Sequence, residues 1–267
     1  MTYSRKTLAR PVVLEGLGLH SGEPVTVTLH PSDGGIWFRR DAHRVEARPE
    51  NVTDTSRCTR LGEISTIEHF MSAFAALEIT DLEVELSNAE LPGLDGSSAP
   101  LLGLLLDAGL VSVGEFELAA LFTRVFLQED ALKIAIARGQ GHWRYDFNIE
   151  GRWPGEQSFE LHNVIADYAT EVAPARTFAT AEELPKIIEM GLGRGLDESS
   201  CLILGIDGYK NDARFADEPA RHKLLDLIGD LYLSGVPLRA LSVVAQRSGH
   251  RTNVQAAYQL RQAILAS

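Results

Sequence analysis

Three short segments, far apart in the chain, carry side chains that could bind a metal ion and move protons. They contain, in order, Glu68 and His69, then His222 and Asp226, then His250. Two imidazoles and one carboxylate can hold a zinc ion and leave one position open, which is the arrangement of hydrolytic zinc sites. A further glutamate and a further histidine would then be available as base and acid. The sequence therefore indicates metal-assisted hydrolysis as the chemistry of these segments.

The segment at residues 218–233 has the apolar spacing of a helix and a polar stripe on one face. His222, Asp226 and Asp230 are four residues apart, so each lies about one turn beyond the last, with a drift of about 40° per step. A histidine and an aspartate one turn apart can share a metal ion, but they also form ordinary ion pairs on solvated helices. Two leucines flank Asp226. If the aspartate is buried there, it needs a cation or a hydrogen-bond donor.

Glu68 and His69 lie near the start of a helix predicted over residues 66–77. A carboxylate next to a metal ligand could act as a base on a water molecule at the metal's open position. Ser65 and Glu68 also fit a capping box, in which a glutamate at the third helical position accepts a hydrogen bond from the serine N–H. That alternative makes Glu68 a structural residue, and the local pattern leaves both interpretations open.

His250 lies between a strand predicted at residues 238–245 and a final helix predicted at 253–265. Such junctions often present functional side chains from a rigid scaffold. The simpler alternative is a turn histidine, with Thr252 or Asn253 capping the helix.

The composition is that of an ordinary soluble globular protein. The chain has 267 residues, 45% hydrophobic and 23% charged. Its formal charge of −12 disfavours binding to nucleic acid or to an anionic membrane surface. Its apolar runs are too short to span a bilayer, so we expect no stable membrane insertion, and its first residues lack a signal-peptide pattern. The two cysteines are expected to be reduced thiols in a cytoplasmic protein, and nothing in the sequence indicates an oligomeric state.

The elements that must position these side chains occur in the same order in both halves of the chain. The first half has strand patterns followed by helix, strand and helix, at residues 9–14, 25–29, 35–39, 66–77, 82–86 and 98–108. The second half follows the same order, at residues 120–127, 131–136, 143–149, 218–233, 238–245 and 253–265. We therefore predict an α+β protein with two similar domains, residues 1–115 and 116–267, each an antiparallel-rich sheet packed on helices.

Taken together, the motifs resemble those of the UDP-3-O-acyl-N-acetylglucosamine deacetylase family, the zinc amidases of lipid A biosynthesis. The matching segments are in family order and span nearly the whole chain: residues 16–22, 54–59, 65–69, 94–97, 173–178, 217–230 and 249–253. Each motif alone is unspecific, but the set is highly specific. The resemblance implies an acylated UDP-amino-sugar as the substrate.

The resemblance also implies a role for each candidate residue. A Zn²⁺ cofactor would be bound by three residues: His69, His222 and Asp226. Glu68 would be the general base that takes a proton from the attacking water. His250, positioned by Asp230, would stabilise the oxyanion as a cation and protonate the leaving amine, while Thr177 would hydrogen-bond the oxyanion. The substrate would be held by three further residues: Lys223, Phe178 and His20.

The fold implied by the resemblance places the active site between two α+β layers. A βαβ insert in the second domain, around residues 162–200, would form a passage for the acyl chain. Its apolar lining would come from five residues: Phe178, Leu184, Ile187, Ile188 and Leu192.

Some segments depart from the family pattern. The stretch between Cys58 and Glu68 is short, Ala179 stands where a second aromatic is common, and residues 193–198 lack a Gly-Ser pair and a following asparagine. These changes leave the chemistry intact but affect the expected contacts with the acyl chain, sugar and nucleotide. One alternative is therefore a zinc deacetylase for another N-acetylated sugar or sugar nucleotide. The other is a non-catalytic zinc-binding protein, although structural zinc sites usually take four ligands and favour cysteine.

Overall fold

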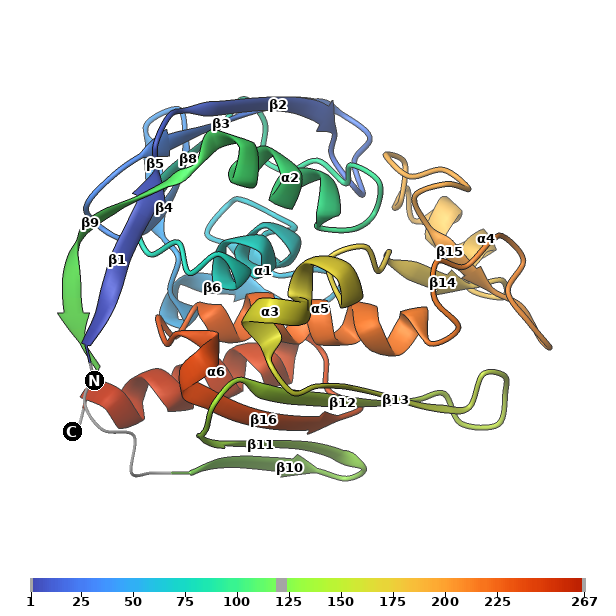
Figure 1. Cartoon of the computed structure of the whole chain (residues 1–267). Coiled ribbons are helices and arrows are strands. Elements are labelled where there is room, and N and C mark those ends of the chain that lie inside the picture. The colour runs from blue at the N-terminus through green and yellow to red at the C-terminus, as the bar shows by residue number, and fades with distance from the viewer. Residues whose placement is uncertain (1, 119–123, 266–267) are drawn as a thin grey trace.

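Two five-stranded sheets form the outer layers of the molecule and enclose a layer of helices (Figure 1). The computed structural model describes residues 2–118 and 124–265. In order across the first sheet, the strands are β2 (Val12–Leu17), β3 (Pro24–Pro31), β8 (Leu82–Leu86), β4 (Ile36–Arg40) and β5 (His43–Glu46). The second sheet has β10 (Val125–Glu129), β11 (Leu132–Arg138), β16 (Leu241–Gln246), β12 (His142–Asn148) and β13 (Glu156–Leu161).

Both sheets have the same strand order. Numbered along the chain within each sheet, the strands lie first, second, fifth, third, fourth. The central strand pairs in parallel with one neighbour, β8 with β4 and β16 with β12, and every other pairing within the two sheets is antiparallel. The predicted α+β class with two similar halves is confirmed, while the boundary at residues 115 and 116 stays a prediction.

The helical layer contains two equivalent pairs, one from each half. These helices are α1 (Glu68–Ala76), α2 (Ala99–Ala108), α5 (Glu218–Tyr232) and α6 (His250–Leu265). The helices α1 and α5 pack closely, and a Cβ atom on Gly229 would lie 2.0 Å from the carbonyl oxygen of Glu68. Only glycine fits at that contact, which brings the start of α1 against the middle of α5.

The two central elements are buried for different reasons. In β8, Leu82, Val84 and Leu86 are buried and alternate with half-buried glutamates, the pattern of a strand with one face on the core. Helix α5 is buried nearly all round, including the ionisable His222 and Asp226. The solvated helix face that was one interpretation of this segment is therefore excluded.

Smaller elements complete the fold. The strands β1 (Thr2–Leu8) and β9 (Leu110–Glu117) form an antiparallel ribbon, and β6 (Val52–Asp54) pairs with β7 (Arg60–Leu61). Short 3₁₀ turns occupy Pro49–Asn51 and Leu238–Ala240. The second half contains the insert, made of α3 (Val164–Glu171), β14 (Phe178–Thr180), α4 (Leu184–Glu189) and β15 (Leu202–Leu204). Because β14 and β15 pair in parallel around α4, the predicted βαβ insert is present, and β14, α4 and β15 lie at the right of Figure 1.

Several boundaries differ from the sequence expectations. The strand predicted at 120–127 begins at Val125 within the described residues, and residues 119–123 lie outside them. The strand predicted at 238–245 begins only at Leu241, because its first residues form a 3₁₀ turn. The final helix begins at His250 rather than at residue 253. No helix in the described residues is long and apolar enough to cross a membrane.

Candidate active site

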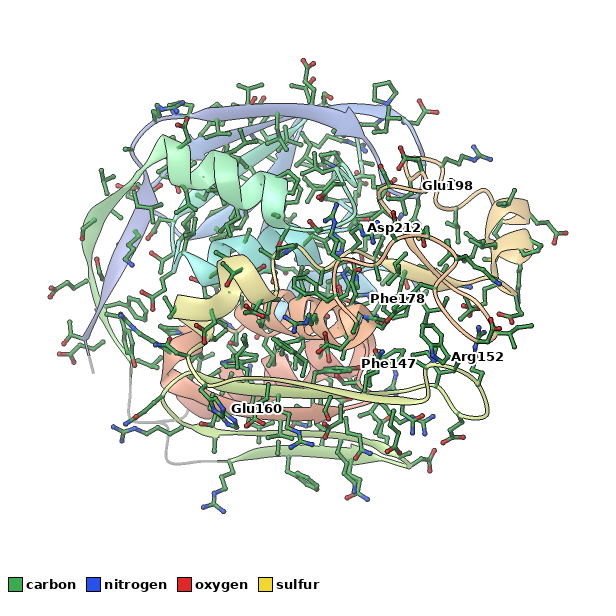
Figure 2. The ribbon with its side chains drawn as sticks, turned by 45° about the vertical axis from the view of Figure 1, so that its right-hand side comes forward. Phe147, Arg152, Glu160, Phe178, Glu198 and Asp212 are labelled. Carbon is green, nitrogen blue, oxygen red and sulfur yellow. The ribbon has the colours of Figure 1, made fainter. Side chains whose placement is uncertain are left out.

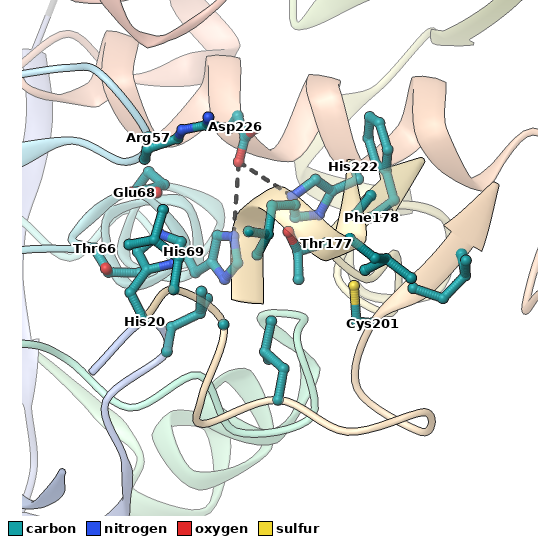
Figure 3. Close-up of a pocket in the computed structure, with 18 of the residues that line it drawn as sticks. His20, Arg57, Thr66, Glu68, His69, Thr177, Phe178, Cys201, His222 and Asp226 are labelled. Atoms are coloured by element: carbon teal, nitrogen blue, oxygen red, sulfur yellow. Dashed lines mark ion pairs between the residues drawn. The ribbon is translucent and has the colours of Figure 1, made fainter. Parts of the chain in front are cut away.

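The three candidate metal ligands meet where α1 packs on α5 (Figure 3). The Nε2 atoms of His69 and His222 lie 3.7 Å and 3.5 Å from Oδ1 of Asp226, and all three side chains are buried. One donor atom from each lies within 4.8 Å of the others. Asp226 Oδ1 has no hydrogen-bond partner, although it is buried. An acceptor left unpaired between two imidazole nitrogens fits a bound divalent cation.

The surroundings hold the three candidate ligands in forms that can bind a metal. Nδ1–H of His222 donates to the carbonyl oxygen of Ala175 at 3.1 Å, which leaves Nε2 with a free lone pair. Burial, together with the neighbouring His222, lowers the pKa of His69 to about 3, and burial also lowers the pKa of His222. Burial works against the charge of Asp226, but Lys223 and the nearby imidazoles hold its pKa below its usual range. The ligands are thus neutral imidazoles and an ionised carboxylate, the forms that bind metals.

Glu68 does not belong to a capping box. It is the first residue of α1, the N-cap is Ile67, and Ser65 Oγ instead accepts from Nε of Arg60 at 3.0 Å. Oε2 of Glu68 accepts a hydrogen bond from the backbone N–H of Thr59 at 3.0 Å. Burial raises the pKa of Glu68 to about 7, with nearby aspartates adding to the shift and His250 opposing it. A carboxyl that titrates near neutral pH suits a general base.

His250 lies close to Glu68 and is held by Asp230. Its Nδ1–H donates to Asp230 Oδ2 at 3.1 Å, while its Nε2 lies 3.9 Å from Glu68 Oε1 and 4.0 Å from Asp226 Oδ2. Burial opposes its charge, but the carboxylates of Asp230, Glu68 and Asp226 outweigh burial and raise the pKa of His250 to about 9. His250 is therefore a cation at neutral pH and can donate a proton. Its contacts with three buried carboxylates are not those of a turn histidine.

A carboxylate that the sequence motifs do not single out holds the loop that contains His20. Glu90 accepts the backbone N–H groups of His20 and Ser21, each at 2.8 Å, and the hydroxyl of Thr66 at 3.1 Å. Thr66 has φ = 65°, a strained conformation for a β-branched residue. These bonds tie residues 18–22 to the start of α1, and His20 lines the cavity with a buried, unpartnered Nδ1.

The remaining predicted residues line the same cavity as the three candidate metal ligands. Lys223 Nζ lies 2.9 Å from Asp226 Oδ2 and 5.7 Å from the centre of the Phe178 ring. Phe178, the first residue of β14, packs edge-on against Phe147 of β12 with 5.6 Å between the ring centres, and Figure 2 shows the two residues near each other. Thr177 lines the same cavity, and its backbone N–H donates to Gly96 at 2.8 Å. The structure thus brings together all ten candidate residues named from the sequence.

The site opens into a cavity of about 610 Å³ with a polar and an apolar end. The polar end contains the three candidate metal ligands, Glu68, His250 and Arg57. The insert supplies the apolar end, which includes all five residues predicted for it: Phe178, Leu184, Ile187, Ile188 and Leu192. Ile203 adds to this lining. Such a cavity can hold a polar head group at the carboxylates and an alkyl chain along the insert.

Comparisons with known proteins agree with this chemistry. A family model for UDP-3-O-acyl N-acetylglycosamine deacetylase matches residues 5–262. The chain is 36% identical to the UDP-3-O-acyl-N-acetylglucosamine deacetylase of Myxococcus xanthus, over 94% of this chain and 84% of the relative. It is 35% identical to the enzyme of the same name from Wolinella succinogenes, over 93% and 87%. It is 36% identical to that of Xanthomonas axonopodis pv. citri, again over 93% and 87%.

Proposed function

Because the chain belongs to the UDP-3-O-acyl N-acetylglycosamine deacetylase family, we propose that it hydrolyses the N-acetyl group of UDP-3-O-acyl-N-acetylglucosamine in lipid A biosynthesis. Water cleaves the amide and gives acetate and a free amine on the sugar. The observation that carries the proposal is the placement of Glu68 and His250 together beside one buried set of three candidate metal ligands.

We take the metal to be Zn²⁺, held by His69, His222 and Asp226. Two imidazoles and a carboxylate form a donor set that catalytic zinc sites use, and the unpaired Asp226 Oδ1 supports a cation there. When bound, zinc supplies a Lewis acid that polarises the amide carbonyl and makes water a stronger acid. The free thiols of Cys58 and Cys201 support a reducing, cytoplasmic setting.

The chain's own residues divide the proton transfers between them. Glu68, as a carboxylate, takes a proton from the attacking water. Protonated His250 lies in the same site and gives its proton to the departing nitrogen. The proton is needed because a neutral amine is a better leaving group than a deprotonated amine anion. Asp230 keeps Nδ1 of His250 protonated, so Nε2 is the atom that faces the substrate. One base and one acid in the same site fit both stages of amide cleavage.

The developing oxyanion and the substrate need further contacts. The positive charge of His250 and the hydroxyl of Thr177 would stabilise the oxyanion. Lys223, Phe178 and His20 line the same cavity and would hold the sugar and its substituents. Mass spectrometry after incubation with UDP-3-O-acyl-N-acetylglucosamine tests the function directly, and an unchanged substrate would contradict it.

Removing a ligand should remove the metal. Asp226→Ala takes away the only anionic ligand, so we expect zinc content to fall from close to one per chain to a small fraction, with loss of turnover. Metal analysis of the purified proteins measures this. The matched control is Asp207→Ala, at an exposed aspartate just after β15, which should keep both metal and activity. Full metal and full turnover in the Asp226 variant would make the ligand assignment wrong.

The pH dependence of kcat/KM should be bell-shaped. Activity needs ionised Glu68, whose pKa is raised to about 7, so the rate falls as pH drops through that value; a bound cation would shift this limb to lower pH. Activity also needs protonated His250, whose pKa is raised to about 9, so the rate falls as pH rises through that value. His250→Ala should lower kcat/KM by about 10²–10⁴-fold and remove the basic limb. A basic limb that persists in this variant would show that another group is the acid.

A further inference from the structure

The outer face of the second sheet carries two histidines and a glutamate at one end of the β12–β13 pair. Trp143 pairs with Leu161, so His142 and His162 are the next neighbours across the two strands. Glu160 lies two residues before His162 and therefore points to the same face. Figure 2 shows Glu160 on this sheet, away from Phe178 and the candidate active site.

The three side chains are close enough to share one ion. Nε2 of His142 contacts Glu160 Oε1, and Nδ1 of His162 lies 4.0 Å from the same oxygen. The two rings stack at 5.5 Å with 15° between their planes, and one donor atom from each of the three residues lies within 4.8 Å of the others. The side chains are 35%, 37% and 84% exposed for His142, Glu160 and His162, so they can rotate toward a solvent ion.

The neighbouring arginine, Arg144, donates no hydrogen bond to Glu160, so the carboxylate can contact a metal ion. Arg144 is directly opposite Glu160 in the strand pairing, where it could neutralise the carboxylate. Its guanidinium instead donates to Asp146 at 2.9 Å. Glu160 therefore faces the two imidazoles. Its negative charge would add to their nitrogen donors in binding a cation.

We propose that His142, Glu160 and His162 form a second metal site, separate from the active site, for a late first-row divalent cation such as Zn²⁺. Imidazole suits these metals, and the carboxylate compensates part of their charge. Water would complete the coordination, because all three ligands lie at the surface. The site is independent of the proposed deacetylase activity and should bind its ion more weakly than the buried ligands do.

Equilibrium dialysis of the zinc-loaded protein against Zn²⁺ tests the proposal. The wild type should hold one more equivalent of zinc than His162→Asn, and both should deacetylate equally well. The matched control is His30→Asn, because His30 forms a surface pair with Glu85 at 2.9 Å but belongs to no three-residue group of possible metal ligands within the described residues. Equal zinc content in the wild type and His162→Asn would overturn the site, as would loss of the extra equivalent in His30→Asn.

A different observation concerns Thr59, a fully buried residue just before β7. Its backbone N–H donates to Glu68 Oε2 at 3.0 Å, and its hydroxyl donates to Asp230 Oδ1 at 2.6 Å. The other oxygen of Asp230 accepts from His250 Nδ1 at 3.1 Å and from Asn253 Nδ2 at 3.0 Å. Thr59 thus connects the candidate base directly with the residue that orients the candidate acid.

No other donor to Asp230 Oδ1 is found in residues 2–118 and 124–265. Without the Thr59 hydroxyl, the carboxylate could turn about its remaining bonds to His250 and Asn253. The imidazole would turn with it, away from the substrate nitrogen. The backbone bond to Glu68 would remain, since it does not depend on the side chain.

We also infer that Thr59 is a positioning residue that fixes His250 relative to Glu68; this inference rests on the proposed deacetylase function. Thr59→Val keeps the shape and the backbone N–H but removes the hydroxyl. It should lower kcat roughly 10- to 100-fold, the factor that corresponds to a hydrogen bond to a charged group, with KM and zinc content unchanged. Thr59→Ser restores the hydroxyl and should restore kcat.

The outcomes separate this inference from the proposed function. A wild type that does not deacetylate the substrate contradicts the function itself. An active wild type with normal kcat in Thr59→Val, or with no rescue in Thr59→Ser, overturns the positioning role alone. A loss confined to KM or to zinc content would also overturn it. Thr53→Val, at an exposed hydroxyl that donates to Gly62 at 2.6 Å, is the control and should behave as wild type.

Discussion

Glutamine in place of Glu68 should lower kcat/KM by about 10²–10⁴-fold, the usual range for a general base, while zinc stays close to one per chain. Glutamine has nearly the same shape and can still accept the Thr59 N–H, so the start of α1 should be preserved. It cannot take a proton from water at neutral pH. Steady-state kinetics together with metal analysis separates a lost base from a lost ion.

The control for this variant is Glu63→Gln, which makes the same chemical change at an exposed position close by in the chain. It should retain wild-type kinetics. Thermal unfolding of both variants reports whether the fold is affected. Near-normal turnover in Glu68→Gln would show that Glu68 is a structural residue and not the general base.

The acyl chain of the substrate should have a large effect on kcat/KM. UDP-N-acetylglucosamine, which lacks the chain, should have a kcat/KM roughly 10³-fold below that of the acylated substrate. Each buried methylene is worth about 0.8 kcal/mol, so about ten of them supply several kcal/mol after ordering costs, and each 1.4 kcal/mol is about tenfold. The apolar end of the cavity, lined by the insert, provides the surface for this burial.

Two variants of the insert sharpen the test. Ile187→Ala shortens a side chain in the apolar end of the cavity and should lower kcat/KM for the acylated substrate only. Ile206→Ala removes a side chain that is 75% exposed and outside the cavity lining, so it should change neither value. Equal kcat/KM for the two substrates in the wild type would contradict the proposal that the natural substrate is acylated. The proposed amide hydrolysis would not be affected by that result.

Much of the fold could be predicted because its central elements have strong local patterns. The strand at Leu82–Leu86 alternates apolar residues with glutamates, and its predicted bounds are those of β8. Helix α5 repeats apolar residues at helical spacing, and its predicted start at Glu218 is correct. The separate motifs could be combined into one candidate site because a known family supplied their common context, which spacing alone could not.

The remaining features depend on contacts between distant parts of the chain. Thr59 and Asp230 are 171 residues apart, so no local pattern predicts their hydrogen bond. The capping-box interpretation failed because Thr66 has a positive φ that delays the helix until Glu68, and Glu90 holds that conformation. The strand predicted at 120–127 rests on apolar character alone, and within the described residues β10 covers Val125–Glu129.

The shared ligand set has a thermodynamic consequence for the whole molecule. One proposed ligand, His69, comes from the first half, whereas the other two, His222 and Asp226, come from the second. A metal ion that binds only when both halves are in place stabilises the folded protein by an amount that grows with its free concentration, about 2.7 kcal/mol at 100 times the dissociation constant. The proposed catalytic ion would thus also act as a tether between the two similar halves, and metal starvation would lower the protein's stability together with its activity.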